Sequence, residues 1–212
     1  MVTIIDYGIG NLRSIEKAFE RVGADVERTD DPASIRNAER LVLPGVGAFG
    51  ACIDELRSRD LESVILERVG EGIPFLGVCV GMQLLFDTGR EKGTHEGLGL
   101  LPGEVVHFHR AEEGGAEALK VPHMGWNTLD PTRDDPLFDG LDGERYVYFV
   151  HSYHAVAADP DHVLATTDYG HSFPAMVRRD NIYGVQFHPE KSQSTGLRIL
   201  ENFARLPRTV PS

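Results

Sequence analysis

Apolar and polar positions follow an alternating pattern of strands and helices through the first ~90 residues. Short apolar runs that indicate strands are separated by longer stretches with apolar residues at helical spacing, such as Leu12, Ile15, Phe19 and Val22. The run at 73–79 is almost continuously apolar, as expected for a strand covered on both faces of a parallel sheet. The pattern predicts strands at 2–7, 25–27, 39–43 and 73–79, and helices at 12–22, at 52–69 and from 82–86 onward.

The second half of the chain has a different pattern, with short strand-like runs at close intervals. The predicted strands cover 104–109, 127–129, 146–150, 163–167, 175–178 and 182–187, and a helix at 195–206 follows them. The polar stretch 110–118 is interpreted as an exposed loop, and neither a linker nor an internal repeat divides the chain. We therefore expect one α/β domain over residues 1–212. Its sheet should be open, doubly wound and mixed, with parallel strands in its first half.

Composition and charge exclude several classes of function. The formal net charge of the 212 residues is −12, which disfavours nucleic acid as a partner. No apolar run is long enough to cross a membrane, and the N-terminal segment lacks the basic start of a signal peptide, so a cytoplasmic protein is expected. Two cysteines, Cys52 and Cys79, do not form a disulfide framework.

A glycine pair near the N-terminus partly matches the dinucleotide-binding fingerprint. Gly8-Ile9-Gly10 lies between a predicted strand and a predicted helix, but Arg13 stands where the fingerprint requires a third glycine. We therefore interpret the pair as a tight turn and expect no cofactor.

The segment Gly77-Val78-Cys79-Val80-Gly81 has the pattern of a nucleophile elbow, with cysteine in place of serine. It lies between the buried strand and the next helix. Glycine flanks remove the Cβ atoms that would crowd a sharp turn or block access to the nucleophile. The start of the following helix favours a thiolate at Cys79. Cys52 lies in a helical pattern without an elbow and is interpreted as buried filler.

His188 is the candidate general base. It ends the apolar strand 182–187 and is followed by Pro189 and Glu190. Ligands of open α/β sheets gather at the carboxyl ends of strands, so His188 and Cys79 should share one edge. Glu190 can turn back to orient the imidazole. His151 and His154 have a spacing seen in metal sites, but no cysteine or carboxylate cluster accompanies them, and no metal is expected.

Hydrolysis of an amide also requires donors for an oxyanion. The N–H of Val80, directly after the nucleophile, is the first candidate. The second should come from Pro44-Gly45-Val46-Gly47, which follows a predicted strand, so Val46 and Gly47 complete the predicted oxyanion site.

These segments together resemble the class I, triad-type glutamine amidotransferases. The main matches are Gly-Val-Cys-Val-Gly-Met-Gln at 77–83 and Tyr-Gly-Val-Gln-Phe-His-Pro-Glu-Lys-Ser at 183–192. Four further stretches, at 6–14, 44–50, 122–127 and 148–153, resemble the glutaminase subunits of imidazole glycerol phosphate synthase. The resemblance covers essentially the whole chain except the 110–118 loop. It implies a catalytic triad of Cys79, His188 and Glu190.

The resemblance also implies a substrate and a partner. In this family glutamine is hydrolysed to glutamate and ammonia. A cyclase subunit with a (β/α)₈ barrel, bound as a heterodimer, uses the ammonia to form imidazole glycerol phosphate and aminoimidazole carboxamide ribonucleotide in histidine biosynthesis. The implied glutamine contacts are Gln83, Glu91, His151, Ser152 and Tyr153, and the implied partner contacts are Asn11, Trp126, Tyr148 and Lys191.

Three alternatives remain from the sequence. The chain could serve another ammonia-using synthase, such as those making anthranilate, carbamoyl phosphate, guanylate or pyridoxal phosphate, but these lack the Pro-His-Met-Gly-Trp-Asn segment at 122–127. It could be a non-catalytic interaction subunit, although an inactive subunit has no need of an intact Cys79, His188 and Glu190. A cysteine peptidase is the third alternative, which an assay with peptide substrates would distinguish.

Overall fold

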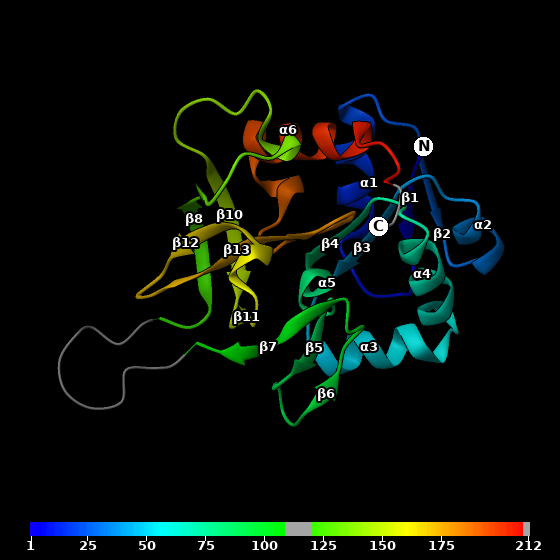
Figure 1. The fold of residues 1–212 in the computed structure, drawn as a ribbon, viewed down its shortest axis with the longest axis horizontal. Coiled ribbons are helices and arrows are strands. Elements are labelled where there is room, and N and C mark those ends of the chain that lie inside the picture. Colours follow the sequence, from blue (N-terminus) through cyan, green and yellow to red (C-terminus); the bar gives the residue numbers. More distant parts are fainter. Residues whose placement is uncertain (109–119, 210–212) are drawn as a thin grey trace.

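A large mixed sheet forms the centre of the molecule (Figure 1). The computed structural model describes residues 1–108 and 120–209. Eight strands lie in the order β2-β1-β3-β4-β14-β13-β12-β9. Five of them run parallel: β1 (Val2–Ile5), β2 (Val26–Thr29), β3 (Leu41–Gly45), β4 (Phe75–Cys79) and β14 (Ile182–Val185). The antiparallel part consists of β13 (Ser172–Arg179), β12 (Val163–Asp168) and β9 (Asp130–Pro131).

Helices cover both faces of the parallel part of the sheet. Figure 1 shows α1 (Leu12–Arg21) and α6 (Gln193–Arg205) on one side, and α3 (Phe49–Ser58) and α4 (Leu61–Gly70) on the other. The short α2 (Pro32–Arg36) packs against α4. The rings of Phe19 and Phe203 join α1 to α6, with centroids 6.3 Å apart. Every residue of β1, β3, β4 and β14 is buried, which explains their continuous apolar sequences. The predicted doubly wound, mixed sheet is confirmed.

The predicted single helix at 52–69 is wrong, because the chain forms two helices there. The break falls between α3 and α4 at Asp60, whose φ of 57° lies in the left-handed region. Apolar spacing is compatible with both helices, and no glycine or proline marks the break in the sequence.

The helix predicted from 82–86 onward is also wrong in its extent. α5 (Val80–Gln83) begins directly after Cys79 and ends after one turn, and the chain then enters β5 (Phe86–Gly89). The apolar run Leu84-Leu85-Phe86 is fully buried, and a buried run of this kind suits a strand as well as a helix.

Two smaller sheets complete the fold beside the large one. One consists of β8 (His123–Thr128) and β10 (Tyr146–His151). The other has the order β11-β7-β5-β6, with β6 at His95–Glu96, β7 at Leu101–His107 and β11 at Tyr153–Ala157. Single 3₁₀ turns occur at Pro136–Phe138, Pro160–His162 and Pro189–Lys191. The loop predicted at 110–118 lies outside the described residues. In the described ranges, no helix has both the length and the apolarity to span a bilayer.

Candidate active site

Cys79 occupies a strained turn between β4 and α5. Its φ of 56° and ψ of −113° are unusual for a residue with a side chain, and it is the N-cap residue of α5. The thiol therefore lies beside free N–H groups of a helix start. Such an outlier at a predicted nucleophile supports a functional constraint.

The two glycines that flank Cys79 are required by close backbone contacts. A Cβ on Gly77 would lie 2.5 Å from the carbonyl oxygen of Gly81, and one on Gly81 would lie 1.9 Å from that of Leu43. Both contacts are with backbone, which cannot rotate away. The elbow thus needs glycine at both positions, as the sequence pattern predicted.

His188 and Glu190 reach the same edge of the sheet as Cys79. β14 pairs with β4 in parallel, and the chain continues from Val185 to His188 at the carboxyl end. The Nδ1 of His188 lies 3.0 Å from Oε1 of Glu190, and both side chains are buried. Burial disfavours the charged ring, but hydrogen bonds with Cys79 and Glu190 outweigh it and raise the pKa of His188 to about 10. The geometry favours an imidazolium between a sulfur and a carboxylate.

Asn11 gives the carboxylate of Glu190 a second partner. Its Nδ2 donates to Oε1 of Glu190 over 3.1 Å. Burial disfavours the charged carboxylate, but the bonds from His188 and Asn11 contribute to holding the pKa of Glu190 below its usual value. The sequence assigned Asn11 to a partner surface and gave no signal of this bond.

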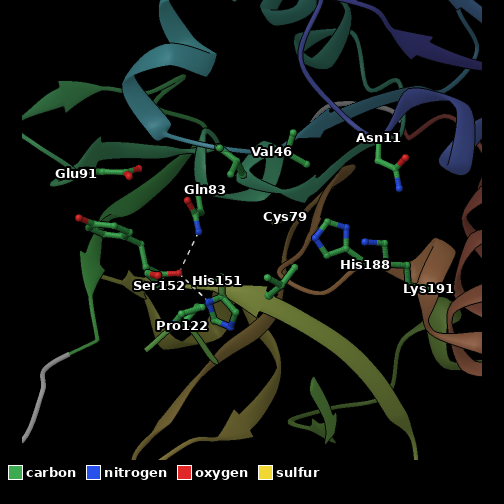
Figure 2. Close-up of a pocket in the computed structure, with 14 residues that line it drawn as sticks. Asn11, Val46, Cys79, Gln83, Glu91, Pro122, His151, Ser152, His188 and Lys191 are labelled. Carbon is green, nitrogen blue, oxygen red and sulfur yellow. Dashed lines mark hydrogen bonds between the residues drawn. The ribbon is translucent and has the colours of Figure 1, made fainter. Parts of the chain in front are cut away.

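A cavity of about 550 Å³ opens at this edge of the sheet. Its walls hold Glu91 and Gln83 on one side and His188, Lys191 and Asn11 on the other (Figure 2). The structure brings twelve predicted residues to the cavity: Asn11, Val46, Gly47, Cys79, Val80, Gln83, Glu91, His151, Ser152, Tyr153, His188 and Lys191. Sequence analysis did not select Pro122 and Val150, although both stand in the quoted segments 122–127 and 148–153.

Gln83 and Glu91 each present one polar group to the cavity. The Nε2 of Gln83 donates to the carbonyl of Tyr153 over 3.1 Å and to Oε1 of Gln186 over 3.1 Å. Both of its N–H bonds are thus used, and its amide oxygen is the atom left for a ligand. Glu91 accepts from the N–H of Phe49 at the start of α3 over 2.9 Å, which fixes its carboxylate at the cavity wall.

The predicted oxyanion segment lies at the end of β3, which pairs with β4 so that Gly45 stands opposite Cys79. A Cβ on Gly45 would lie 2.7 Å from the N of Gly81, so this close approach requires glycine. Two buried side chains form hydrogen bonds with the backbone of the segment 44–47. Tyr7 donates to the carbonyl of Pro44 over 2.8 Å, and the Cys52 thiol donates to that of Val46 over 3.3 Å. Cys52 is buried as expected, but it also contacts this segment.

Among residues 1–108 and 120–209, no group of three or more histidine, cysteine, aspartate or glutamate side chains has an arrangement that could hold a metal ion.

Comparison with known families identifies the family of the chain. The family model for "Glutamine amidotransferase class-I" matches residues 3–206. The chain belongs to the class-I glutamine amidotransferases.

Two curated relatives of this amidotransferase carry the same name. The chain is 70% identical over 209 residues to the "Imidazole glycerol phosphate synthase subunit HisH" of Salinibacter ruber, covering 99% of this chain and 96% of the relative. Identity is 55% over 203 residues to the HisH subunit of Syntrophotalea carbinolica, covering 96% and 98% of the two chains. The amidotransferase therefore groups with the HisH subunits.

Solved structures agree on the fold of the amidotransferase. A crystal structure described as "glutamine amidotransferase" matches with a TM-score of 0.73 at 21% identity, covering 97% of this chain and 99% of the other. "PurLQS from Thermotoga maritima" matches with a TM-score of 0.72 at 19% identity, covering 95% and 96%. At such identities these neighbours support the fold alone.

Two predicted partner contacts of the amidotransferase, Trp126 and Tyr148, lie outside the cavity lining. Trp126 and Tyr148 are cross-strand partners on β8 and β10, and their rings meet edge to face with centroids 5.9 Å apart. The Nζ of Lys191 lies 5.8 Å from the centre of the Tyr148 ring. Trp126, Met124 and Tyr146 are exposed on the same strand pair. An exposed aromatic group of this kind is typical of a protein interface.

Proposed function

We infer that this chain is the glutaminase subunit of an imidazole glycerol phosphate synthase, with Cys79, His188 and Glu190 as its triad. The observation that carries the triad is the hydrogen bond of Glu190 to His188, whose ring lines the same cavity as the strained Cys79. High identity to HisH subunits over the full length of the chain supports the synthase to which it belongs.

The proposed reaction begins with attack of the Cys79 sulfur on the side-chain carbonyl of glutamine. His188 holds the thiol proton as an imidazolium, and Glu190 keeps that ring in position. The tetrahedral oxyanion is stabilised by N–H groups of Val80 and of the Val46–Gly47 segment.

The second half of the reaction releases both products. The imidazolium of His188 protonates the leaving nitrogen, so ammonia departs and a glutamyl thioester remains on Cys79. His188 then accepts a proton from water, the hydroxide attacks the thioester, and glutamate leaves as the thiolate is restored. Gln83 and Glu91 suit the α-ammonium of glutamine, because both present oxygen acceptors. Backbone at His151, Ser152 and Tyr153 would hold the α-carboxylate.

The partner is proposed to be a (β/α)₈-barrel cyclase bound as a heterodimer in the cytoplasm. The exposed Trp126, its neighbour Tyr148, and Asn11 and Lys191 at the cavity supply a surface that joins the interface to the active site. Ammonia would pass from this cavity to the cyclase, which forms imidazole glycerol phosphate and aminoimidazole carboxamide ribonucleotide.

Co-expression with the cyclase subunit of the same organism tests this function. We expect a one-to-one complex that forms imidazole glycerol phosphate from glutamine and releases glutamate in equal amounts. A complex that accepts ammonia but never glutamine, or no complex at all, would contradict the proposal.

A further inference from the structure

The carbonyl oxygen of Tyr153 accepts hydrogen bonds from two side chains at the proposed glutamine site. It accepts from Nδ1 of His151 over 2.8 Å and from Nε2 of Gln83 over 3.1 Å. Figure 2 shows both bonds as dashed lines converging beside Ser152. A carbonyl oxygen has two lone pairs, so this acceptor is saturated and its peptide is fixed in orientation.

The bond from His151 continues into a chain of side chains. Nε2 of His151 lies 3.0 Å from Nδ1 of His123, and Nε2 of His123 lies 3.3 Å from Nδ2 of Asn127. The pairing of β8 with β10 sets His123 directly opposite His151. The His123 ring is stacked between Phe149 and Tyr169, with centroids 4.7 and 4.1 Å away, which keeps its plane fixed.

The direction of this chain follows from its two ends. At one end the Tyr153 oxygen can only accept, so His151 must carry its proton on Nδ1. At the other end Asn127 donates to the carbonyl of Asp168 over 2.8 Å, while its Oδ1 accepts from the N–H of Thr128 over 2.9 Å. The amide nitrogen of Asn127 therefore faces His123 and donates to it.

One protonation pattern satisfies every contact. His123 accepts from Asn127 at Nε2, so it must donate from Nδ1 to Nε2 of His151, which in turn donates from Nδ1 to Tyr153. A second proton on either ring would be carried by its Nε2, where it would face another N–H donor instead of an acceptor. Burial, the largest cause for both rings, acts in the same direction and lowers the pKa of His123 to about 4 and that of His151 to about 3.

We propose that Asn127, His123 and His151 form a one-way hydrogen-bond chain that positions the glutamine-binding backbone at Ser152 and Tyr153. His123 and Asn127 are positioning residues, because they act through His151. The proposal rests on the function inferred above and explains what the segment 122–127 contributes inside the subunit, beyond any contact with a partner.

The same carbonyl connects the chain to the nucleophile. Gln83 donates both to Tyr153 and to Gln186, and Nε2 of Gln186 lies 4.0 Å from the sulfur of Cys79. A displaced Tyr153 carbonyl would release Gln83 and turn its amide oxygen away from the cavity. Loss of the histidine chain should therefore weaken glutamine binding more than it slows the chemical steps.

Steady-state glutaminase kinetics of the complex with the cyclase test the proposal. For His123→Ala we expect KM for glutamine to rise about 10-fold or more while kcat changes less than about threefold, because a buried hydrogen bond is lost. His123→Asn keeps a donor where Nδ1 was and should restore most of the affinity. His123→Gln places its donor at the Nε2 position and should not. His162→Ala, on the 3₁₀ turn at Pro160–His162 and outside the chain of hydrogen bonds, should match the wild type.

An unchanged KM in His123→Ala, or equal rescue by asparagine and glutamine, would overturn the proposal. A wild-type complex without glutaminase activity would instead contradict the proposed function. If His123→Ala fails to fold, the wild type still provides a test. ¹⁵N NMR of its imidazoles should show neutral His123 and His151, both protonated at Nδ1, and a proton on Nε2 of either ring would refute the chain.

Discussion

Asn11 donates a hydrogen bond of 3.1 Å to Oε1 of Glu190, the oxygen that also bonds to His188. The two residues are 179 positions apart in the chain. Asn11 also lines the cavity and belongs to the surface proposed for the cyclase. A shift of Asn11 on docking would therefore act directly on the carboxylate of the proposed triad.

Removal of this donor should slow glutamine hydrolysis. We expect Asn11→Ala to lower kcat of the glutaminase reaction about 10-fold, because a bond to a charged group is lost, and to leave KM for glutamine nearly unchanged. Asn37→Ala removes an exposed amide that donates to the carbonyl of Ala33 in α2, and it serves as the matched control. Equal kcat values for Asn11→Ala and the control would show that Asn11 does not position Glu190.

Loss of the charge of Glu190 should have a larger effect. Glu190→Gln keeps the size of the side chain, but it removes the carboxylate that orients His188 and stabilises its positive charge. We expect kcat to fall about 100-fold or more while the circular dichroism spectrum stays the same. Activity within a few-fold of wild type would show that Glu190 contributes little to catalysis.

Acid pH should destabilise the subunit through its buried histidines. The pKa values of His123 and His151, about 4 and about 3, lie below the unfolded value near 6.5. The folded state thus binds fewer protons than the unfolded chain, and their contribution to stability, present above pH 6.5, is lost as pH falls toward 3.

Each of these rings contributes a slope of up to about 1.4 kcal/mol per pH unit in that window. Urea unfolding between pH 7 and 4.5 measures this slope, and His123→Asn should reduce it. An identical slope in the wild type and in His123→Asn would contradict the assignment.

The sequence allowed the triad to be proposed because the features that suggest it are local. The elbow at 77–81 and the strand that ends at His188 are each contained in a few residues, and parallel pairing brings their ends together. The close backbone contacts at Gly77 and Gly81 agree with the interpretation of these two glycines, since the need for glycine is set by the turn itself.

Features that depend on long-range geometry were missed. The strand β5 was not predicted because the apolar run Leu84-Leu85-Phe86 before and at its start is compatible with a buried helix as well as with a buried strand. The contact of His123 with His151 requires the register of β8 against β10, which periodicity does not encode. The break between α3 and α4 was missed for a local reason. Asp60 adopts a left-handed conformation, which aspartate tolerates, so no glycine marks the break in the sequence.

The most direct test of the account is the activity of the cyclase complex that carries Cys79→Ala. In the proposed function, the glutaminase and cyclase reactions would occupy different active sites, with only ammonia passing between them. With glutamine as nitrogen source we expect formation of imidazole glycerol phosphate to be abolished, because the nucleophile is gone. With ammonium salts the same complex should match the wild type. Glutamine-dependent synthesis that survives in Cys79→Ala, or loss of both activities in a folded and assembled complex, would contradict the account.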